Sequence, residues 1–221
     1  MYMLWNTARV FFEQILDTVF PLSNRVRRVR AHRNDPLTIA MHTTFLNGQS
    51  IQTLCSYSNT AVKDAIGASK FEESTAAMQQ LAHVLDDFLI DAALEHAYTH
   101  GERILVVPVP LHHTRERARG YNQMDAILTR TRAVSEGFVE YAPDILTRLR
   151  HSTPQATLTR AARLVNVLGA FACIHPEPRR LRERTIYIVD DVATTGATLA
   201  AAGSSLSPHC PCVELVAIAR A

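Results

Sequence analysis

One stretch near the C-terminus, residues 186–206, constrains the fold of this chain more than any other. Its sequence, IYIVDDVATTGATLAAAGSSL, starts with an apolar β-rich run over residues 186–189, and two adjacent carboxylates, Asp190 and Asp191, follow directly. A loop of small residues, 193–198, comes next, and then an alanine-rich segment that favours a helix. A strand, a short loop and a helix N-terminus in this order predict an α/β protein with a phosphate-sized cradle at the end of a strand.

The loop after the acid pair carries groups that bind a phosphate. Backbone N–H groups at a helix N-terminus and the positive end of the helix dipole attract an anion, and glycine lets a ligand approach the backbone closely. The two carboxylates can accept hydrogen bonds from sugar hydroxyls or hold a divalent cation through water. The candidate phosphate-binding residues are Ala193, Thr194, Thr195, Gly196, Ala197 and Thr198. A ligand with a phosphate beside a diol fits this pattern, and the alternative is an ordinary turn between a strand and a helix.

A second polar segment follows the predicted strand at residues 104–109. It reads LHHTRERARGYNQ over residues 111–123 and concentrates arginines beside a glycine. Open α/β sheets bind ligands beyond the ends of their strands, and arginine offers a planar fork to phosphates. The candidate residues are Arg115, Arg117, Arg119 and Gly120. This loop could close over a pyrophosphate, and the alternative is a solvated charged loop.

Several segments resemble known protein families. VDDVATTGAT, residues 189–198, is similar to the 5-phosphoribosyl-1-pyrophosphate (PRPP) signature of type I phosphoribosyltransferases. The ComF family is phosphoribosyltransferase-like and is linked to DNA uptake in naturally competent bacteria. Three further segments resemble parts of that family: PVPLHHTRERARGYNQ (108–123), TRLRHSTPQATLTRAARLVNVLGAF (147–171) and LVAIAR (215–220). Lys70 and Phe71 sit where the family commonly has a lysine and an aromatic residue, so the resemblance covers most of the chain.

The resemblance implies the type I phosphoribosyltransferase fold and assigns roles by position. Asp190 and Asp191 would be the catalytic pair that holds the ribose hydroxyls, and residues 193–198 would hold the 5′-phosphate. Lys70 would join the arginine loop on the pyrophosphate side. Mg²⁺ would bind mainly through oxygens of PRPP, with no direct protein ligand assigned. The residues on the acceptor side, or alternatively in structural hydrogen bonds, would be Gln155, Arg163 and Asn166.

The chain departs from the ComF pattern near its N-terminus. Many members carry a four-cysteine zinc module after an initial Phe-Pro, but residues 22–35 contain no cysteine. The cysteines of the chain are Cys55, Cys173, Cys210 and Cys212, and none forms a C-x-x-C pair. A structural zinc site therefore has no framework, and we expect no zinc and reduced thiols in the cytoplasm.

The remaining pattern predicts one α/β domain with an appendage. The chain has 221 residues, 47% of them hydrophobic, which is ample for a core. Residues 1–38 are predicted to form an amphipathic helix and a basic linker, and residues 39–221 the phosphoribosyltransferase-like domain. We expect helices at 59–70, 75–100 and 124–133, and strands within 39–57 and at 104–109, 144–150, 168–173, 186–189 and 213–219. Alternation of strands and helices predicts a mostly parallel sheet with helices on both faces.

The N-terminal segment does not read as an export signal. Acidic and basic residues interrupt its apolar stretch, and no apolar run in the chain approaches the ~18 residues that a membrane span requires. We therefore expect no membrane span and a cytoplasmic location. The N-terminal helix itself could pack on the main domain, on a partner subunit or on a membrane surface.

Three functions remain compatible with these features. The first is a PRPP-dependent transferase that moves phosphoribose to an unidentified acceptor and releases pyrophosphate. The second is a non-catalytic module that keeps the PRPP site. The third is a ComF-like competence factor that handles incoming single-stranded DNA through an arginine run, RVRRVRAHR, at residues 25–33. The net charge of only +2 shows that the whole chain is not a polycation, and a homodimer is compatible with all three.

Overall fold

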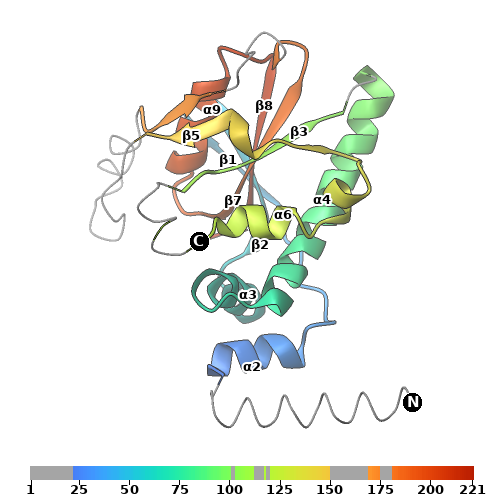
Figure 1. Ribbon diagram of the computed structural model, residues 1–221, viewed down its shortest axis with the longest axis vertical. Helices are drawn as coiled ribbons and strands as arrows, with labels where there is room; N and C mark the ends of the chain where they lie inside the picture. The colour runs from blue at the N-terminus through green and yellow to red at the C-terminus, as the bar shows by residue number, and fades with distance from the viewer. Residues whose placement is uncertain (1–21, 101–102, 112–116, 118–119, 150–168, 175–180) are drawn as a thin grey trace.

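A six-stranded sheet forms the centre of the computed structural model (Figure 1), which describes residues 22–100, 103–111, 117, 120–149, 169–174 and 181–221. The strand order is β1-β2-β8-β7-β3-β4, and β5 and β6 form a separate two-stranded sheet. The strands are β1 (His42–Leu46), β2 (Gln49–Ser56), β3 (Leu105–Pro108), β4 (Glu140–Tyr141), β5 (Leu146–Arg148), β6 (Phe171–Cys173), β7 (Thr185–Ala193) and β8 (Cys212–Arg220). In the central sheet only β1 and β2 pair antiparallel, which confirms the mostly parallel sheet.

One helix precedes β1, and the others lie in the connections between strands. The helices are α2 (Asn24–Ala31), α3 (Thr60–Phe71), α4 (Thr75–His100), α6 (Gln123–Leu128), α7 (Arg132–Ser135) and α9 (Ala197–Leu206), with a 3-10 turn η1 (Pro143–Ile145). The predicted helices at 59–70 and 75–100 are confirmed as α3 and α4. None of the helices among the described residues is long and apolar enough to cross a membrane.

Buried side chains lie on both faces of the sheet. Along β3, Val106 belongs to the core shared with α3, α4 and α6, whereas Leu105 and Val107 belong to the core shared with α9 and the small sheet. Along β8, Val216 and Leu215 divide between the two cores in the same way. This alternation follows from the two-residue period of a strand, and it explains why these runs are continuously apolar in sequence.

Two predicted elements differ from the structure. The helix expected at 124–133 is wrong, because the segment forms α6 and α7 with a break between them. At the break Thr131 Oγ1 donates to the carbonyl of Leu128 at 2.7 Å and accepts from the N–H of Val134 at 3.3 Å, so its side chain caps α7 and competes with a continuous helix. The short strands expected at 144–150 and 168–173 exist as β5 and β6, but they pair antiparallel with each other outside the central sheet.

The arginine run forms helix α2 and packs against α3. Val26 and Val29 are buried in the core, and the guanidinium of Arg28 makes two bonds of 2.6 and 3.0 Å to the carboxylate of Asp64. Residues 24–31 are therefore helical where a linker was expected. The predicted N-terminal helix before residue 22 lies outside the described residues, and the boundary at residue 38 stays a prediction.

Candidate functional site

The acid pair lies inside strand β7. The sequence predicts a strand that ends before Asp190, but β7 continues to Ala193 because its backbone pairs with β8 as far as Arg220. That prediction of the strand end is therefore wrong by four residues. Ladder bonds hold the acid pair on the rigid end of a central strand, so the positions of the two carboxylates are fixed by the sheet.

The loop that follows turns sharply into helix α9. Gly196 is the N-cap residue and has φ of 75°, the left-handed region that glycine enters without a Cβ penalty. A Cβ built on Gly196 would lie 2.3 Å from Cδ1 of Ile51 on β2, so the loop also packs directly on the sheet. Gly196 brings no side-chain acceptor to the first turn of α9, where Oγ1 of Thr195 accepts a long hydrogen bond of 3.4 Å from the N–H of Ala197. An anion can replace this weak acceptor at the helix N-terminus.

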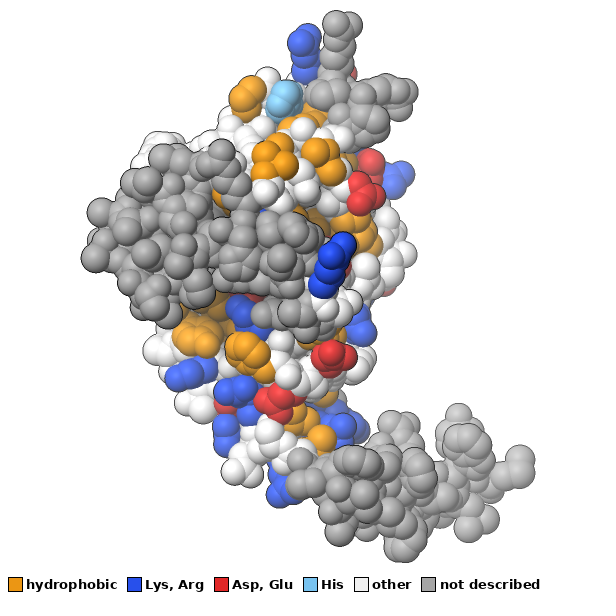
Figure 2. All heavy atoms as spheres, turned by 60° about the vertical axis from the view of Figure 1, so that its left-hand side comes forward, with side chains coloured by type: hydrophobic (Ala, Val, Ile, Leu, Met, Phe, Trp, Pro, Cys, Tyr) orange, Lys and Arg blue, Asp and Glu red, His pale blue; other side chains and the backbone are white. Residues whose placement is uncertain are grey.

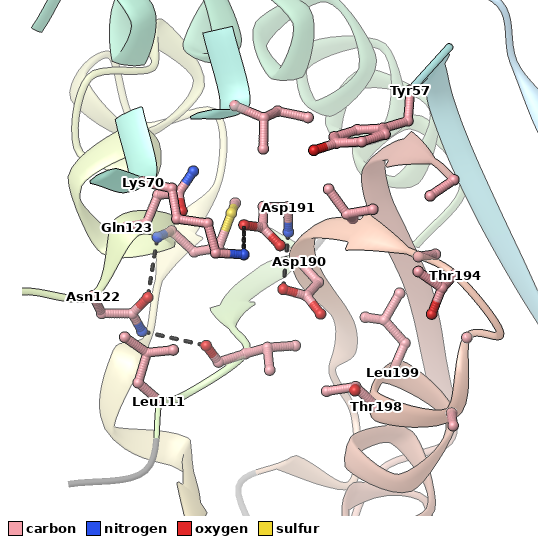
Figure 3. A pocket seen from close by; sticks show the side chains of 18 of the residues that line it. Tyr57, Lys70, Leu111, Asn122, Gln123, Asp190, Asp191, Thr194, Thr198 and Leu199 are labelled. Carbon is pink, nitrogen blue, oxygen red and sulfur yellow. Dashed lines mark hydrogen bonds and ion pairs between the residues drawn. The ribbon is translucent and has the colours of Figure 1, made fainter. Parts of the chain in front are cut away.

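A cavity of about 410 Å³ opens at these strand ends. Its lining includes Lys70, Asp190, Asp191, Arg148, Asn122, Gln123, Tyr57 and residues 193–198. Figure 3 shows the acid pair between two walls, with Lys70 and Gln123 on one side and Thr194 and Thr198 on the other. The elements that build the cavity are the ends of β3, β5 and β7, the last turn of α3, the start of α6 and the start of α9. The site lies where open parallel sheets place their ligands.

The charges in this cavity are coupled. Nζ of Lys70 lies 3.0 Å from Oδ2 of Asp191, and the backbone N–H of Asp191 donates to Oδ1 of Asp190 at 2.9 Å. Burial, and secondly the neighbouring negative charge of Asp191, raise the pKa of Asp190, while Lys70 and Arg148 oppose the rise. Two adjacent carboxylates do not ionise together at low cost, so cations in the cavity control how much charge the pair carries.

The structure brings together some of the predicted site residues and not others. Lys70, which is distant from the acid pair in sequence, lines the same cavity. Arg117 and Gly120 belong to the described residues and are exposed, and neither lines the cavity. Five further predicted residues lie outside the described part of the chain: Arg115, Arg119, Gln155, Arg163 and Asn166. The roles of all these residues stay predictions.

Comparison with known proteins shows that the chain is similar in sequence to a competence protein. No family model matches the chain. Competence protein F of Haemophilus influenzae is 32% identical over 130 residues, which are 59% of this chain and 55% of that protein. The chain is ComF-related. The resemblance noted from its motifs is thereby confirmed, although the chain spans about half the length of the curated relative that it matches.

Four residues with polar side chains that line the cavity were not predicted from the sequence. Arg148 lies in the TRLR segment and Asn122 and Gln123 in the GYNQ segment, yet none was assigned to the site. The GYNQ letters gave a usable signal for Asn122 alone, because asparagine is a preferred N-cap residue and therefore marks the start of a helix. Tyr57 follows β2 and gave no signal, since only the spatial order β2-β8-β7 brings it beside the acid pair.

The cysteines are not part of this cavity. Cys212 is the first residue of β8, at the end of the sheet away from the acid pair, and Cys173 and Cys210 lie close to it. Burial raises the pKa of the Cys210 thiol to about 11, so this group stays protonated at neutral pH. Within the described residues no three His, Cys, Asp or Glu side chains are grouped as metal ligands. The expected lack of zinc is a prediction that this finding does not test.

Proposed function

We propose that the protein binds Mg²⁺-PRPP in this cavity and transfers its phosphoribosyl group to an unidentified acceptor, with release of pyrophosphate, in the cytoplasm. The observation that carries the proposal is one cavity that holds an acid pair on a strand end, a glycine-capped helix N-terminus beside it and a lysine on the facing wall. A diol, a terminal phosphate and a second anionic group on one small ligand match these three features. We also propose the type I phosphoribosyltransferase fold, with which the mostly parallel sheet is compatible.

The parts of the ligand divide among the walls of the cavity. The loop from residue 193 to 198 would take the 5′-phosphate, and Asp190 and Asp191 would accept hydrogen bonds from the ribose hydroxyls. Lys70 would release Asp191 and turn to the pyrophosphate, together with the arginines of the 115–119 segment. The acid pair can reach Mg²⁺ through water, and Mg²⁺ would supply charge neutralisation of the pyrophosphate.

The chemistry is a substitution at C1′ of the ribose. A nitrogen nucleophile forms the new bond to C1′ as the bond from C1′ to the pyrophosphate oxygen breaks, and pyrophosphate leaves with the electron pair. Positive charge develops on the sugar ring, where the carboxylates of Asp190 and Asp191 would stabilise it. Lys70 would stabilise the negative charge of the leaving group, so the catalytic effect would come from positioning and electrostatics.

Calorimetry with fragments of the ligand tests the binding part of this proposal. We expect Mg²⁺-PRPP to bind, and ribose 5-phosphate to bind more weakly because it lacks the pyrophosphate. Its matched control is 2-deoxyribose 5-phosphate, which lacks one hydroxyl and should bind about tenfold more weakly if the carboxylates read the diol. Equal affinities for the two sugars, or no binding of PRPP by the folded protein, would refute the proposed site. Turnover is then tested by pyrophosphate release in a screen of amine and nucleobase acceptors.

Replacing Lys70 by methionine should separate the two ends of the ligand. Removal of a charge-assisted hydrogen bond to the pyrophosphate is expected to weaken Mg²⁺-PRPP binding about tenfold. Binding of ribose 5-phosphate should not weaken, because Asp191 no longer has to exchange its ion pair for a sugar hydroxyl. The matched control is Lys63→Met. Lys63 is the other lysine of the chain, and its Nζ lies 6.0 Å from the centroid of the Tyr57 ring. An equal loss for both ligands in Lys70→Met would contradict the assignment of Lys70 to the pyrophosphate.

A second candidate function comes from the name of the relative, competence protein F. We propose as the alternative that the chain is a non-catalytic competence factor that assists the handling of single-stranded DNA through the arginines of α2. Fewer arginines are available for this role than the sequence suggests, because Arg25 contacts Glu72, the residue just after α3, and Arg28 contacts Asp64 on α3. Figure 2 shows several Lys and Arg side chains on the face in view, interspersed with acidic ones.

Salt dependence tests the DNA alternative. Arg27 and Arg33 are exposed, and replacing both by glutamine should weaken the binding of a single-stranded oligonucleotide. The slope of log affinity against log salt should become shallower by about 0.7 for each phosphate that the variant no longer neutralises. The control is Arg130→Gln, which removes one positive charge from an exposed residue just after α6. An unchanged slope in the Arg27→Gln/Arg33→Gln variant would exclude Arg27 in α2 and Arg33 just after it as phosphate contacts, and would contradict the DNA alternative.

A further inference from the structure

The last turn of α3, which carries Lys70, contacts the segment 121–123 at the start of α6. Gln123 is only 2% exposed, and its Nε2 donates to Oγ of the fully buried Ser69 at 2.6 Å. The hydroxyl of Tyr121 donates to the backbone carbonyl of the same serine. Two side chains of one short segment therefore converge on the residue that directly precedes Lys70.

The direction of the Gln123 bond is fixed by its surroundings. Oγ of Ser69 donates its proton to the carbonyl of Ile66 at 3.0 Å, so toward Gln123 it can only accept. The amide must present its nitrogen to Ser69, which leaves Oε1 buried and without a hydrogen-bond partner among the described residues. An unpaired buried acceptor is a cost that most folds avoid. The side chain is thus held by the contact of its nitrogen with Ser69.

The other end of this connection is anchored in the sheet. Asn122 donates from Nδ2 to the carbonyl of Val109, just beyond β3, at 3.3 Å, and its Oδ1 accepts from the N–H of Met124 at 3.0 Å to cap α6. The segment therefore stands on the end of β3, next to β7. Through its contacts with Ser69, the segment holds the last turn of α3 in place relative to the sheet. Helix ends that lack such contacts fray.

The residue that follows Lys70 is exposed, and the side chain of Lys70 faces the cavity. Phe71, the last residue of α3, is 70% exposed, and the Lys70 side chain meets Asp191 across the cavity at 3.0 Å. A lysine has a long flexible stem and loses considerable rotamer freedom when it is fixed. A main chain at Ser69 that is already held in place leaves only this side-chain entropy to be lost when Lys70 pairs with Asp191.

We propose that Gln123 is a positioning residue that holds Lys70 at Asp191 by fixing Ser69 to the sheet. Gln123 acts through Ser69 and does not itself contact the reacting groups. The proposal rests on the proposed function only for its consequence in PRPP binding. The placement of Lys70 is a property of the ligand-free protein and can be measured without any ligand.

Lysine-selective NMR offers this ligand-free measurement, because Lys63 and Lys70 are the only lysines in the chain. With lysine labelled at its side-chain carbon and nitrogen, the spectrum holds two side-chain signals. Asp191→Asn identifies the Lys70 signal and shows how far it moves when the ion pair is broken. We expect Gln123→Met to move the Lys70 signal in the same direction by at least half as much, and to leave the Lys63 signal, which also reports on α3, in place.

Gln80 supplies the matched control. It is also a buried glutamine, 6% exposed, and its Nε2 donates to the carbonyl of His32 at 2.7 Å, far from the cavity. Gln80→Met makes the same chemical change and should not move the Lys70 signal, even where it lowers stability. Movement of the Lys70 signal in Gln80→Met to the same extent as in Gln123→Met would overturn the proposal, because the effect would then be general loosening.

A double-mutant cycle tests the route through Ser69. Ser69→Ala removes the acceptor of the Gln123 bond with little change in volume, and it also serves if Gln123→Met fails to fold. The double variant should displace the Lys70 signal no further than the larger single variant, since both changes break one connection. Additive displacements would mean that Gln123 acts by another route and would overturn the inference.

The consequence for ligand binding separates this inference from the proposed function. We expect Gln123→Met to weaken Mg²⁺-PRPP binding about threefold to tenfold and ribose 5-phosphate binding less. A native protein that does not bind PRPP, but whose Lys70 signal moves in Gln123→Met, would refute the proposed function alone. A native protein that binds PRPP, with a Lys70 signal that Gln123→Met leaves unchanged, would refute the positioning role alone.

Discussion

Replacing both Asp190 and Asp191 by asparagine is expected to weaken Mg²⁺-PRPP binding about 100-fold. Each carboxylate would accept a hydrogen bond from a ribose hydroxyl, and a bond to a charged acceptor contributes about 1 kcal/mol more than one to a neutral amide. Loss of this difference at two positions, together with the loss of negative charge near Mg²⁺, amounts to about 3 kcal/mol. Calorimetry on the native and double-variant proteins at one salt concentration measures the effect.

Asp86 provides a matched control for this experiment. It is a buried aspartate on α4, 5% exposed, and its Oδ1 accepts from the N–H of Ala133 at 2.9 Å. Asparagine at this position keeps the acceptor and lies away from the cavity, so Asp86→Asn should bind PRPP as the native protein does. Undiminished binding by the Asp190→Asn/Asp191→Asn variant would remove the acid pair from the proposed site.

Asp190→Asn alone should raise the stability of the protein at neutral pH, whereas loss of the acid pair should weaken PRPP binding. Because burial and Asp191 raise the pKa of Asp190, the native state binds this proton more tightly than the unfolded chain does. The stability contributed by the bound proton is present at low pH and is lost as pH rises from about 4 toward the raised value. Asp190→Asn should therefore flatten the fall in Tm over this range and raise Tm at neutral pH. A Tm profile identical to that of the native protein would show that Asp190 does not carry this proton.

This expected opposition would support the proposed role of the pair. A carboxylate whose pKa is raised in the folded protein lowers the stability of the fold once it ionises, as we expect of Asp190. Strongly shifted ionisable groups of this kind concentrate in functional sites. The geometry thus supports the hydroxyl-binding role that the resemblance implies.

The sequence predicted the wall of the cavity formed by residues 190–198, the proposed phosphate side, better than the other walls. Residues 190–198 are contiguous, so one strand-loop-helix pattern sufficed to place the acid pair beside a helix N-terminus. Lys70 was assigned only through the resemblance, because it reaches Asp191 through the tertiary packing of α3 against the sheet. No local pattern predicts a contact between residues so far apart in the chain.

The errors in the predicted fold have local physical causes. The apolar run alone underestimated β7, since polar residues at a strand end stay in the ladder while their backbone has a partner in β8. The break between α6 and α7 depends on the side-chain bonds of Thr131, which helix periodicity does not register. The arginine run looked like a solvated linker because its two buried valines are hidden among charges, and because Asp64, which binds Arg28, is remote in sequence.

Gly196→Ala is expected to lower the free energy of unfolding by about 2–5 kcal/mol and to abolish measurable PRPP binding. An L-residue at φ of 75° costs about 1–2 kcal/mol, and the added Cβ would lie 2.3 Å from Cδ1 of Ile51, an overlap that costs about 1–3 kcal/mol to relieve. Relief requires the loop to move off the sheet, which displaces the N–H groups at the start of α9. Urea unfolding measures the stability, and calorimetry with Mg²⁺-PRPP measures the binding.

Two further variants separate the free-energy cost of the backbone conformation at residue 196 from the cost of the steric overlap with Ile51. Gly48 in the β1–β2 turn has φ of 78° and open space around its Cα, so Gly48→Ala should show the conformational cost alone and leave PRPP binding intact. Ile51→Val deletes Cδ1 at a cost of about 0.5–1.5 kcal/mol. In that background Gly196→Ala should cost at least about 1 kcal/mol less than in the native protein, with partial recovery of binding. Equal costs in both backgrounds would mean that Ile51 does not constrain the loop, and that backbone conformation alone selects glycine at this position.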